Sequence, residues 1–425
     1  MNLFPLHRVT VHVEHKGGDF VLLDTHYHFD FLSNQPLRAA FLDALSTHSA
    51  APYARTGASS THYAAPSAQS ANPSTHSAAP APHNADGAGD LEQPVNVVAQ
   101  TLTPSDYVVL IHEAEQLAAP GRRLPLWSLG FHPWYITSRK QADAELAVFR
   151  SQLRSTRFIG EIGLDFAPRR LEQASAELQT HVFRTIVTEV CAAAGEVRGA
   201  DATHYAMARE VSDRAKRHHP PFGDTADHIS SRKHSPSNCS SAPHVPYVLS
   251  THAVRASSAV IDILEELRIG RYNVAPIIHW FSGTSDELTR FIALGGYISV
   301  NHRMLATKRG RAYARQIPAE RLLIETDLPE SPVIPSQCSY QYSYSASPTS
   351  PENSGSATAE NTDTVTAKDS YKITEELAEF HAQKLISTVN GIVCKLQNIR
   401  GKEVVASILH NQQRLYAQGN YPQTA

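Results

Sequence analysis

The sequence contains few cysteines, and none is paired by its spacing. Its 425 residues include four, without a CxxC pair: Cys191, Cys239, Cys338 and Cys394. This pattern supports neither a disulfide framework nor a thiolate zinc site, and it favours a reducing compartment. Long apolar runs are also absent, because no stretch approaches the ~20 residues of a membrane helix and charge and proline interrupt the first segment. We therefore expect a protein of the cytoplasm or nucleus, without a secretory signal or membrane span.

A strong net charge is missing as well. Lysine and arginine number 38, aspartate and glutamate 41, and the sequence pI is about 6.8. This balance excludes a basic nucleic-acid coat and an acidic tail that act through the field of the whole molecule. Any contact with nucleic acid is expected to be local.

Branched aliphatic residues are scarce in three segments, at about 46–94, 197–245 and 331–370. The first consists mainly of alanine, serine, proline and histidine, and the third is rich in serine and tyrosine. Such compositions cannot build a core and are typical of flexible insertions. Without them the chain keeps roughly 290 residues, close to the ~250 of one (β/α)₈ barrel. We expect residues 1–425 to form a single barrel domain with three long insertions.

The remaining sequence alternates short apolar runs with longer stretches of helical period, which is typical of a parallel sheet covered by helices. Eight runs are expected to be strands: 20–24, 107–111, 126–130, 157–161, 247–251, 275–279, 296–300 and 321–325. Helices are expected at 141–154, 172–194, 257–267, 284–294, 372–388 and 402–416. The predicted fold class is α/β, a (β/α)₈ TIM barrel.

Two histidines follow the first run, in the segment DTHYHFD. Because side chains alternate along extended backbone, His26 and His28 point to the same side and can share one metal ion. The alternative is a pair of loop histidines in a chain that has 23 of them.

Other runs also end in metal-binding residue types. Glu161 and His279 end the fourth and sixth runs, and His252 and Asp327 come just after the fifth and eighth. In a barrel the C-terminal ends of the strands meet at one mouth, so these residues are expected to converge there with the two histidines. Taken singly, each is equally compatible with a solvated loop or a helix cap.

These blocks resemble those of the TatD-like metal-dependent hydrolases, most of which are deoxyribonucleases. DTHYHFD is similar to the opening Asp-x-His-x-His-x-Asp of the family, and FIGEIGLDF to its Gly-Glu-Ile-Gly-Leu-Asp. SLGFHPWYI, STHAVRA, IIHWFSGTSDEL and LLIETDLPE resemble further family blocks in the same order. The resemblance covers about 290 residues and leaves the three insertions without a counterpart. It implies a hydrolase of the metal-dependent barrel type that acts on DNA as a 3'–5' exonuclease.

The resemblance also implies a set of site residues. His26, His28 and Asp327 would hold one divalent ion, His252 and His279 a second, and Glu161 would bridge them. Two ions ~3.5–4 Å apart are the usual arrangement for phosphodiester hydrolysis by activated water, with Asp327 orienting that water or accepting its proton. Nitrogen and oxygen ligands leave magnesium, manganese, zinc and nickel open.

Further residues are candidates for substrate contacts. His132 could contact a substrate phosphate or orient a ligand, or could simply pack beside Trp134. Arg255 could hold a phosphate through its planar guanidinium, or form a salt bridge at a helix start. A basic run between Arg303 and Arg315 offers a local nucleic-acid footprint, although a solvated helix face is an equally ordinary explanation. Tyrosines 340, 342 and 344 could stack on bases.

Two other functions stay open from the sequence. Metal-activated water also attacks carbonyl groups, so an amidohydrolase-type reaction on a cyclic amide or an aminoacyl-tRNA ester is an alternative. Many such enzymes bridge their metals with a modified lysine at the fourth strand, where this chain has Glu161. The other alternative is a non-catalytic protein whose insertions bind partners.

Overall fold

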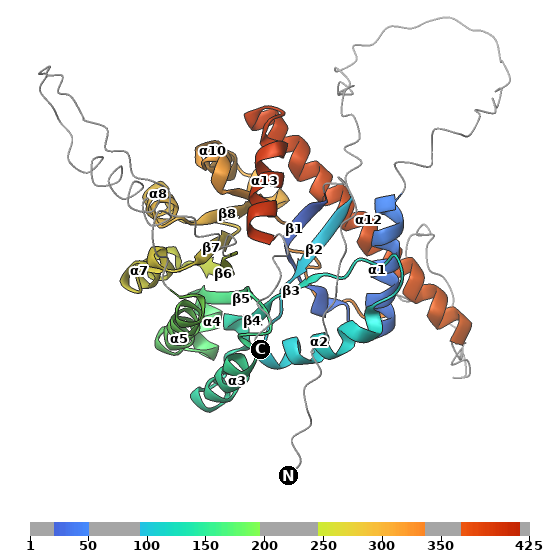
Figure 1. The fold of residues 1–425 in the computed structure, drawn as a ribbon, viewed down its shortest axis with the longest axis horizontal. Helices are drawn as coiled ribbons and strands as arrows, with labels where there is room; N and C mark the ends of the chain where they lie inside the picture. Colours follow the sequence, from blue (N-terminus) through green and yellow to red (C-terminus); the bar gives the residue numbers. More distant parts are fainter. Residues whose placement is uncertain (1–20, 51–93, 196–244, 336–366, 417–425) are drawn as a thin grey trace, which may run out of the picture.

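The computed structural model describes residues 21–50, 94–195, 245–335 and 367–416 (Figure 1). Most of the three predicted insertions, and the tyrosines at 340, 342 and 344, lie outside the described residues. The insertion boundaries need small corrections, because residues 46–50 continue a helix and residues 367–370 begin one.

Nine parallel strand segments occupy the eight strand positions of a barrel. In chain order they are β1 (Leu22–Tyr27), β2 (Val95–Ala99), β3 (Leu126–Trp127), β4 (Leu129–Phe131), β5 (Phe158–Asp165), β6 (Tyr247–Val254), β7 (Val274–His279), β8 (Tyr297–Val300) and β9 (Leu322–Ile324). β3 pairs with β2 while β4 pairs with β5, and only Ser128 separates β3 from β4. A parallel bridge between Tyr27 and Leu328 joins the first strand to the last. This order confirms the predicted (β/α)₈ barrel.

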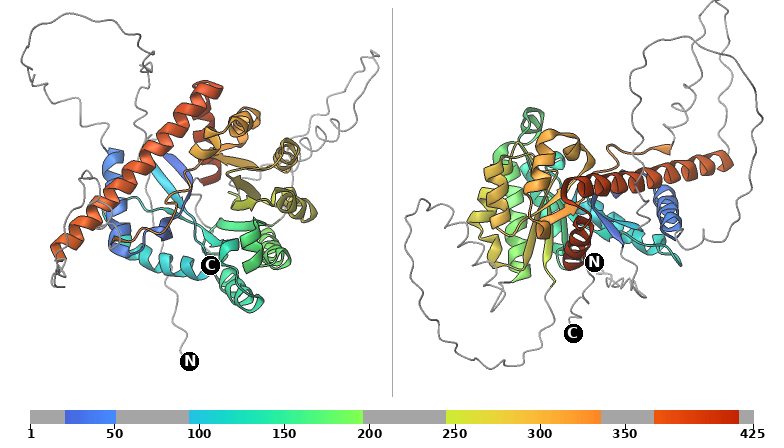
Figure 2. Two further views of the ribbon diagram at one scale, coloured as in Figure 1. Left: turned by 180° about the vertical axis from the view of Figure 1, so that it is seen from behind. Right: turned by 90° about the horizontal axis from the view of Figure 1, so that it is seen from above.

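Helices surround these strands (Figure 1). They are α1 (Gln35–Ala50), α2 (Pro104–Leu117), α3 (Arg139–Gln152), α4 (Pro168–Gln173), α5 (Ala176–Ala194), α7 (Ser257–Glu266), α8 (Ser285–Ala293), α9 (His302–Ala306), α10 (Lys308–Gln316), α12 (Ala367–Arg400) and α13 (Val404–Tyr416). Short 3₁₀ turns lie at Phe29–Phe31, Pro133–Tyr135, Ile269–Arg271 and Ala319–Arg321. The long α12 lies against α1 and extends beyond the barrel (Figure 2). No described helix is long and apolar enough to cross a membrane.

The predicted second strand, 107–111, is wrong, because this run lies inside α2. Thr103 caps that helix by accepting a hydrogen bond from the backbone N–H of Asp106, and Pro104 occupies its first turn. Tyr107 and Leu110 are buried at helical spacing, whereas Val108 and Val109 are 41% and 56% exposed. The true strand, β2, begins directly after the first insertion. A short continuous apolar run does not distinguish strand from helix, and here the capping signal decides.

Another prediction, one helix over 172–194, is also corrected. The chain there forms α4 and then α5, because Ser175 begins a new helix by accepting from the backbone N–H of Leu178. The other predicted helices are found, with α12 considerably longer than 372–388.

The end of the barrel at which the strands begin is filled with apolar side chains and covered by α13. Leu23, Val98, Val248 and Leu323 form a cluster with Leu415 of α13. The Gln412 side chain donates to the carbonyl of Leu23 at 2.6 Å and accepts from its N–H at 3.0 Å. Polar side chains therefore gather at the opposite end, where the strands have their C-termini.

Candidate metal centre

The structure brings all six predicted metal ligands together at the C-terminal mouth of the barrel. His26 lies in β1 and His28 just after it, Glu161 lies in β5, and Asp327 follows β9. His252 lies in β6 and His279 ends β7. Five of the six are buried, and the side chain of Asp327 is 19% exposed. Strands β1 and β6 extend beyond the predicted ends, so that His26 and His252 are strand residues and do not follow a strand.

A β-bulge directs Glu161 into this mouth. The register of β5 shifts between Ile159 and Ile162 against both neighbouring strands, β4 and β6. A bulge re-aims the side chains of the residues it contains. The Glu161 carboxylate consequently lies among histidines from several strands.

The two oxygens of Glu161 face different histidines. Its Oε2 lies 3.0 Å from His26 Nε2 and 3.7 Å from His28 Nε2. Its Oε1 lies 2.7 Å from His252 Nδ1 and 2.8 Å from His279 Nε2. The carboxylate thus separates the histidines into two sets, as a group bridging two ions has to do.

Asp327 completes the first set. Its Oδ1 lies 3.2 Å from His28 Nε2 and 3.7 Å from His26 Nε2. Donor atoms of His26, His28 and Asp327 all lie within 4.8 Å of one another, as do donor atoms of His132, Glu161 and His252. Nitrogen and carboxylate oxygen donors at these separations fit divalent ions.

Contacts behind the histidines fix which nitrogen faces the centre. His26 Nδ1 lies 3.0 Å from Ser250 Oγ, and His252 Nε2 lies 3.2 Å from Asp165 Oδ2. Each contact leaves the other ring nitrogen directed at Glu161, which is how outer groups orient metal-binding histidines. The sequence reasoning missed Asp165, although it stands in the FIGEIGLDF block and ends β5.

His132 differs from these ligands in its hydrogen bonding. Its Nδ1 accepts from the backbone N–H of Trp134 at 3.0 Å, so the neutral ring carries its proton on Nε2. That Nε2 lies 3.1 Å from Glu161 Oε1 and can donate to it. The pKa of His132 is lowered to about 4, mainly because the ring is buried, and the ring is therefore neutral. The ring also packs edge-on against Trp134, so both contacts considered from the sequence are present.

The centre without metal keeps its carboxylates charged. Burial favours the neutral form of Glu161, but His132, His26 and His279 outweigh it and hold its pKa well below the usual range. For Asp327, burial is likewise outweighed by the hydrogen bond to His28, and the pKa falls to about 2. The pKa of His28 rises to about 9, because Asp327 and Glu161 more than offset its burial. A metal ion would therefore displace a proton from His28.

The predicted basic contacts are less close to this centre. Arg255 is exposed after β6, with a φ of 53°, and no carboxylate of the described residues pairs with it. Arg303 pairs with Glu330, and its guanidinium lies 5.3 Å from the Trp280 ring. Arg309 and Arg311 donate to backbone carbonyls. The basic run is thus largely occupied by local structural contacts.

The fold and site together define a class. It is a parallel (β/α)₈ barrel that gathers histidines and carboxylates at its C-terminal mouth, the end at which barrel enzymes have their active sites.

Comparisons with known proteins narrow this class. A family model described as "TatD related DNase" matches residues 237–417. "Deoxyribonuclease Tat-D" of Schizosaccharomyces pombe is 34% identical over 101 residues, which cover 24% of this chain and 32% of that protein. "3'-5' ssDNA/RNA exonuclease TatD" of Edwardsiella piscicida is 46% identical over 56 residues, covering 12% and 22%. The chain thus matches a third or less of the length of these curated relatives.

The chain is also similar to solved structures. The crystal structure of a TatD homologue from Escherichia coli covers 94% of this chain and 98% of its own, with 15% identity and a TM-score of 0.47. The family model covers less than half of the chain, so the protein is similar to TatD-related proteins over these segments.

Proposed function

We propose that this protein is a two-metal hydrolase that cleaves phosphodiester bonds of DNA, as a 3'–5' exonuclease. The observation that carries the proposal is the division of the histidines between the two oxygens of Glu161. Family relatives named as deoxyribonucleases support the choice of DNA as the substrate. Glutamate at this bridging position, where many amidohydrolases have a modified lysine, favours phosphodiesters over amides.

Each ligand has one role in this proposal. His26, His28 and Asp327 would hold one divalent ion, His252 and His279 would hold a second, and Glu161 would offer one oxygen to each. Magnesium, manganese, zinc and nickel remain candidates, since the donor set contains no thiolate. When bound, the ions lower the pKa of a water molecule and neutralise charge on the scissile phosphate.

Two side chains act on substrate and water directly. Asp327 is the most exposed of the six ligands and retains a second carboxylate oxygen, with which it orients the attacking water or accepts its proton. His132 presents an Nε2–H to the site, because its Nδ1 accepts from Trp134. That N–H donates to a phosphate oxygen of the substrate.

Metal content and cleavage test the proposal together. Wild type should retain about two manganese ions per chain and convert end-labelled single-stranded DNA to a ladder of products. Glu161→Gln should lose at least one ion and nearly all cleavage, because the bridging charge is removed. Glu115→Gln, an exposed change on α2, should behave as wild type.

The outcomes separate the alternatives. Two bound ions without DNA cleavage would overturn the nuclease proposal and direct attention to carbonyl substrates such as an aminoacyl-tRNA ester. Absence of both metal and cleavage in folded protein would overturn the catalytic proposal as well and favour an interaction protein.

A further inference from the structure

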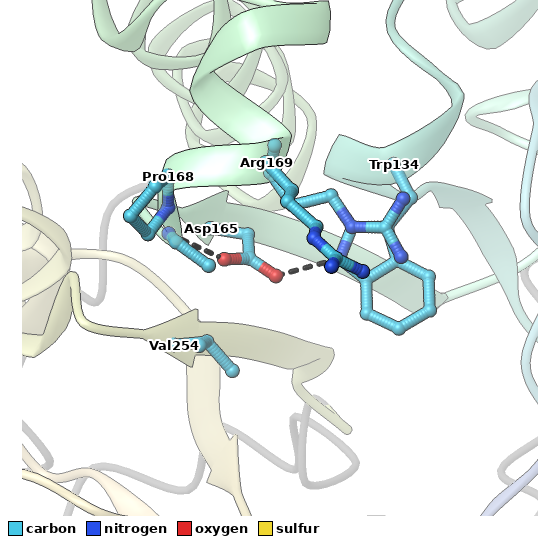
Figure 3. A pocket seen from close by; sticks show the side chains of 7 residues that line it. Trp134, Asp165, Pro168, Arg169 and Val254 are labelled. Atoms are coloured by element: carbon cyan, nitrogen blue, oxygen red, sulfur yellow. Dashed lines mark hydrogen bonds between the residues drawn. The ribbon is translucent and has the colours of Figure 1, made fainter.

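A pocket of about 660 Å³ lies beside the metal centre (Figure 3). Its walls include Trp134, Asp165, Pro168, Arg169, Arg170 and Val254. These residues follow or end β4, β5 and β6, which are neighbours in the sheet. The pocket therefore opens at the same end of the barrel as the six ligands.

One carboxylate connects the pocket to the centre. The indole Nε1 of Trp134 donates to Asp165 Oδ2 at 2.6 Å, and the same oxygen lies 3.2 Å from His252 Nε2. The other oxygen of Asp165 accepts from the backbone N–H of Ala167 at 2.9 Å. Both oxygens are engaged by groups of the protein, which offset part of the negative charge of this carboxylate.

The pocket carries two arginines without acidic partners. Within the described residues no carboxylate lies within 4 Å of the Arg169 or Arg170 guanidinium, whereas several arginines of α3 and α5 are paired: Arg139, Arg150 and Arg184. The Arg170 guanidinium lies 3.7 Å from the centre of the Trp134 ring, which holds it in place. Arg169 is exposed and lines the same pocket (Figure 3).

The remaining wall is apolar and exposed. Trp134 is 39% exposed and Val254 37%, and Pro168 of the pocket wall is exposed as well. Large exposed apolar side chains next to unpaired guanidinium groups suit a ligand that has both a flat ring and a phosphate. A nucleotide has both.

We propose that this pocket binds the nucleotide adjacent to the scissile bond in a single-stranded nucleic acid. Its phosphate contacts Arg169 and Arg170, since a guanidinium binds phosphate oxygens through two parallel N–H groups. Its base packs against Trp134, Pro168 and Val254, which requires an unpaired base. The proposal rests on the proposed nuclease function and adds the side chains that position the substrate strand.

Binding without cleavage tests the pocket. The probe is a fluorescent thymidine tetranucleotide, titrated in chelator into the full-length chain and followed by anisotropy. Arg169→Gln should weaken binding about tenfold, and the slope of log affinity against log salt should fall by about 0.7 for one lost phosphate contact. The control is Arg154→Gln, an exposed arginine just before β5 at the other end of the barrel, which should bind as wild type.

Steady-state cleavage by manganese-loaded protein supplies the second readout. Arg169→Gln should raise KM for the tetranucleotide. The factor of this increase should be at least about tenfold larger than the factor for bis(4-nitrophenyl) phosphate, which has no second nucleotide. If wild type cleaves DNA but both variants match it in affinity and KM, the pocket proposal is wrong and the nuclease proposal stands. If wild type neither binds nor cleaves the tetranucleotide, the nuclease proposal itself fails.

Discussion

Hydrogen bonds behind the histidines decide which ring nitrogens are free to bind metal. Asp165 faces His252 Nε2, which places the proton there and leaves Nδ1 as the donor atom toward Glu161. The backbone N–H of Trp134 has the opposite effect on His132, whose Nε2 becomes a hydrogen-bond donor. Two histidines at similar distances from one carboxylate oxygen thus differ in the chemistry available to them.

The first prediction concerns Asp165→Asn. Removing the charge weakens the acceptor that holds the imidazole proton on His252 Nε2 and thereby leaves Nδ1 free to bind an ion. One amide oxygen also cannot replace both carboxylate oxygens, which accept from Trp134 and Ala167. We expect affinity for the second manganese ion to fall about 10- to 100-fold, measured by calorimetric titration. Asp143→Asn, which removes an exposed partner of Arg139, should leave metal affinity unchanged. Equal affinities in both variants would contradict the assigned role of Asp165.

The second prediction concerns pH. In metal-free protein the pKa of His28 is raised to about 9, so the ring is protonated near neutrality, whereas metal binding needs it neutral. Apparent manganese affinity should therefore increase from about pH 7 to about pH 9 as the competing proton is lost. Titrations across this range in wild type and His28→Asn check it. A flat profile in wild type, or the same slope in the variant, would exclude His28 as a ligand.

At the scale of single elements, β5 contributes most to the geometry of the site. It contributes Glu161 at its bulge and Asp165 at its end, and it packs closely against β6 through Gly163. Gly163 has a φ of 141°, and a Cβ there would lie 2.1 Å from the carbonyl oxygen of His252. A side chain at this position is incompatible with the present distance between the two strands that carry Glu161 and His252.

The third prediction follows from that contact. Gly163→Ala should lower the free energy of unfolding by about 2 kcal/mol or more, since both backbone strain and the clash oppose it. It should also reduce metal retention, because β6 has to move. Urea denaturation and elemental analysis measure the two effects. Gly391→Ala is the matched control: a Cβ on this residue of α12 meets nothing within 4 Å, and removing a helical glycine should stabilise by roughly 0.5–1 kcal/mol.

At the scale of the whole molecule, α13 connects the C-terminal part of the chain to the first strand. Gln412 pairs with both backbone groups of Leu23, and Asn411 donates to the carbonyls of Ala319 and Leu322. One helix thus contacts β1 and the start of β9, the two strands that have to meet for the barrel to close. Closure in turn brings Asp327 to His28, 299 residues earlier in the chain.

The fourth prediction tests this closure. Gln412→Ala leaves the buried N–H and carbonyl of Leu23 without their partner, and it should cost about 1–3 kcal/mol of unfolding free energy. Gln413→Ala, at the exposed neighbouring position of the same helix, should change stability by less than about 0.5 kcal/mol. Urea denaturation of the two variants compares them. Similar losses in both would mean that α13 stabilises the fold through burial alone.

The described ends of two insertions lie away from the mouth. Residues 51–93 connect α1 to the beginning of β2, and residues 196–244 connect α5 to the beginning of β6. Near these junctions the carbonyl of Pro94 accepts from Leu22 N–H, and that of Gly195 from Asn273 N–H, both at strand starts. The position of both junctions follows from the chain order, because an αβ connection ends where a strand begins.

The sequence by itself determined the barrel, the order of most of its elements and the six residues that converge at its mouth. Apolar runs at strand spacing and ligand residues at their ends are local features, and a parallel barrel necessarily gathers them at one edge. It failed at 107–111, where local apolar composition is the same for strand and buried helix. It also failed to find Asp165, because nothing in the neighbouring sequence indicates that this aspartate faces His252.

Only the tertiary structure decided the chemistry of each group. The division of histidines between the oxygens of Glu161 depends on a bulge in β5 and on its register with two neighbours. The protonated nitrogen of His132 depends on a backbone N–H in the following turn, and the pocket at Trp134 depends on three neighbouring strand ends. The 2.7 Å between His252 Nδ1 and Glu161 Oε1, which are 91 positions apart in the chain, comes from packing and register, which no local pattern encodes.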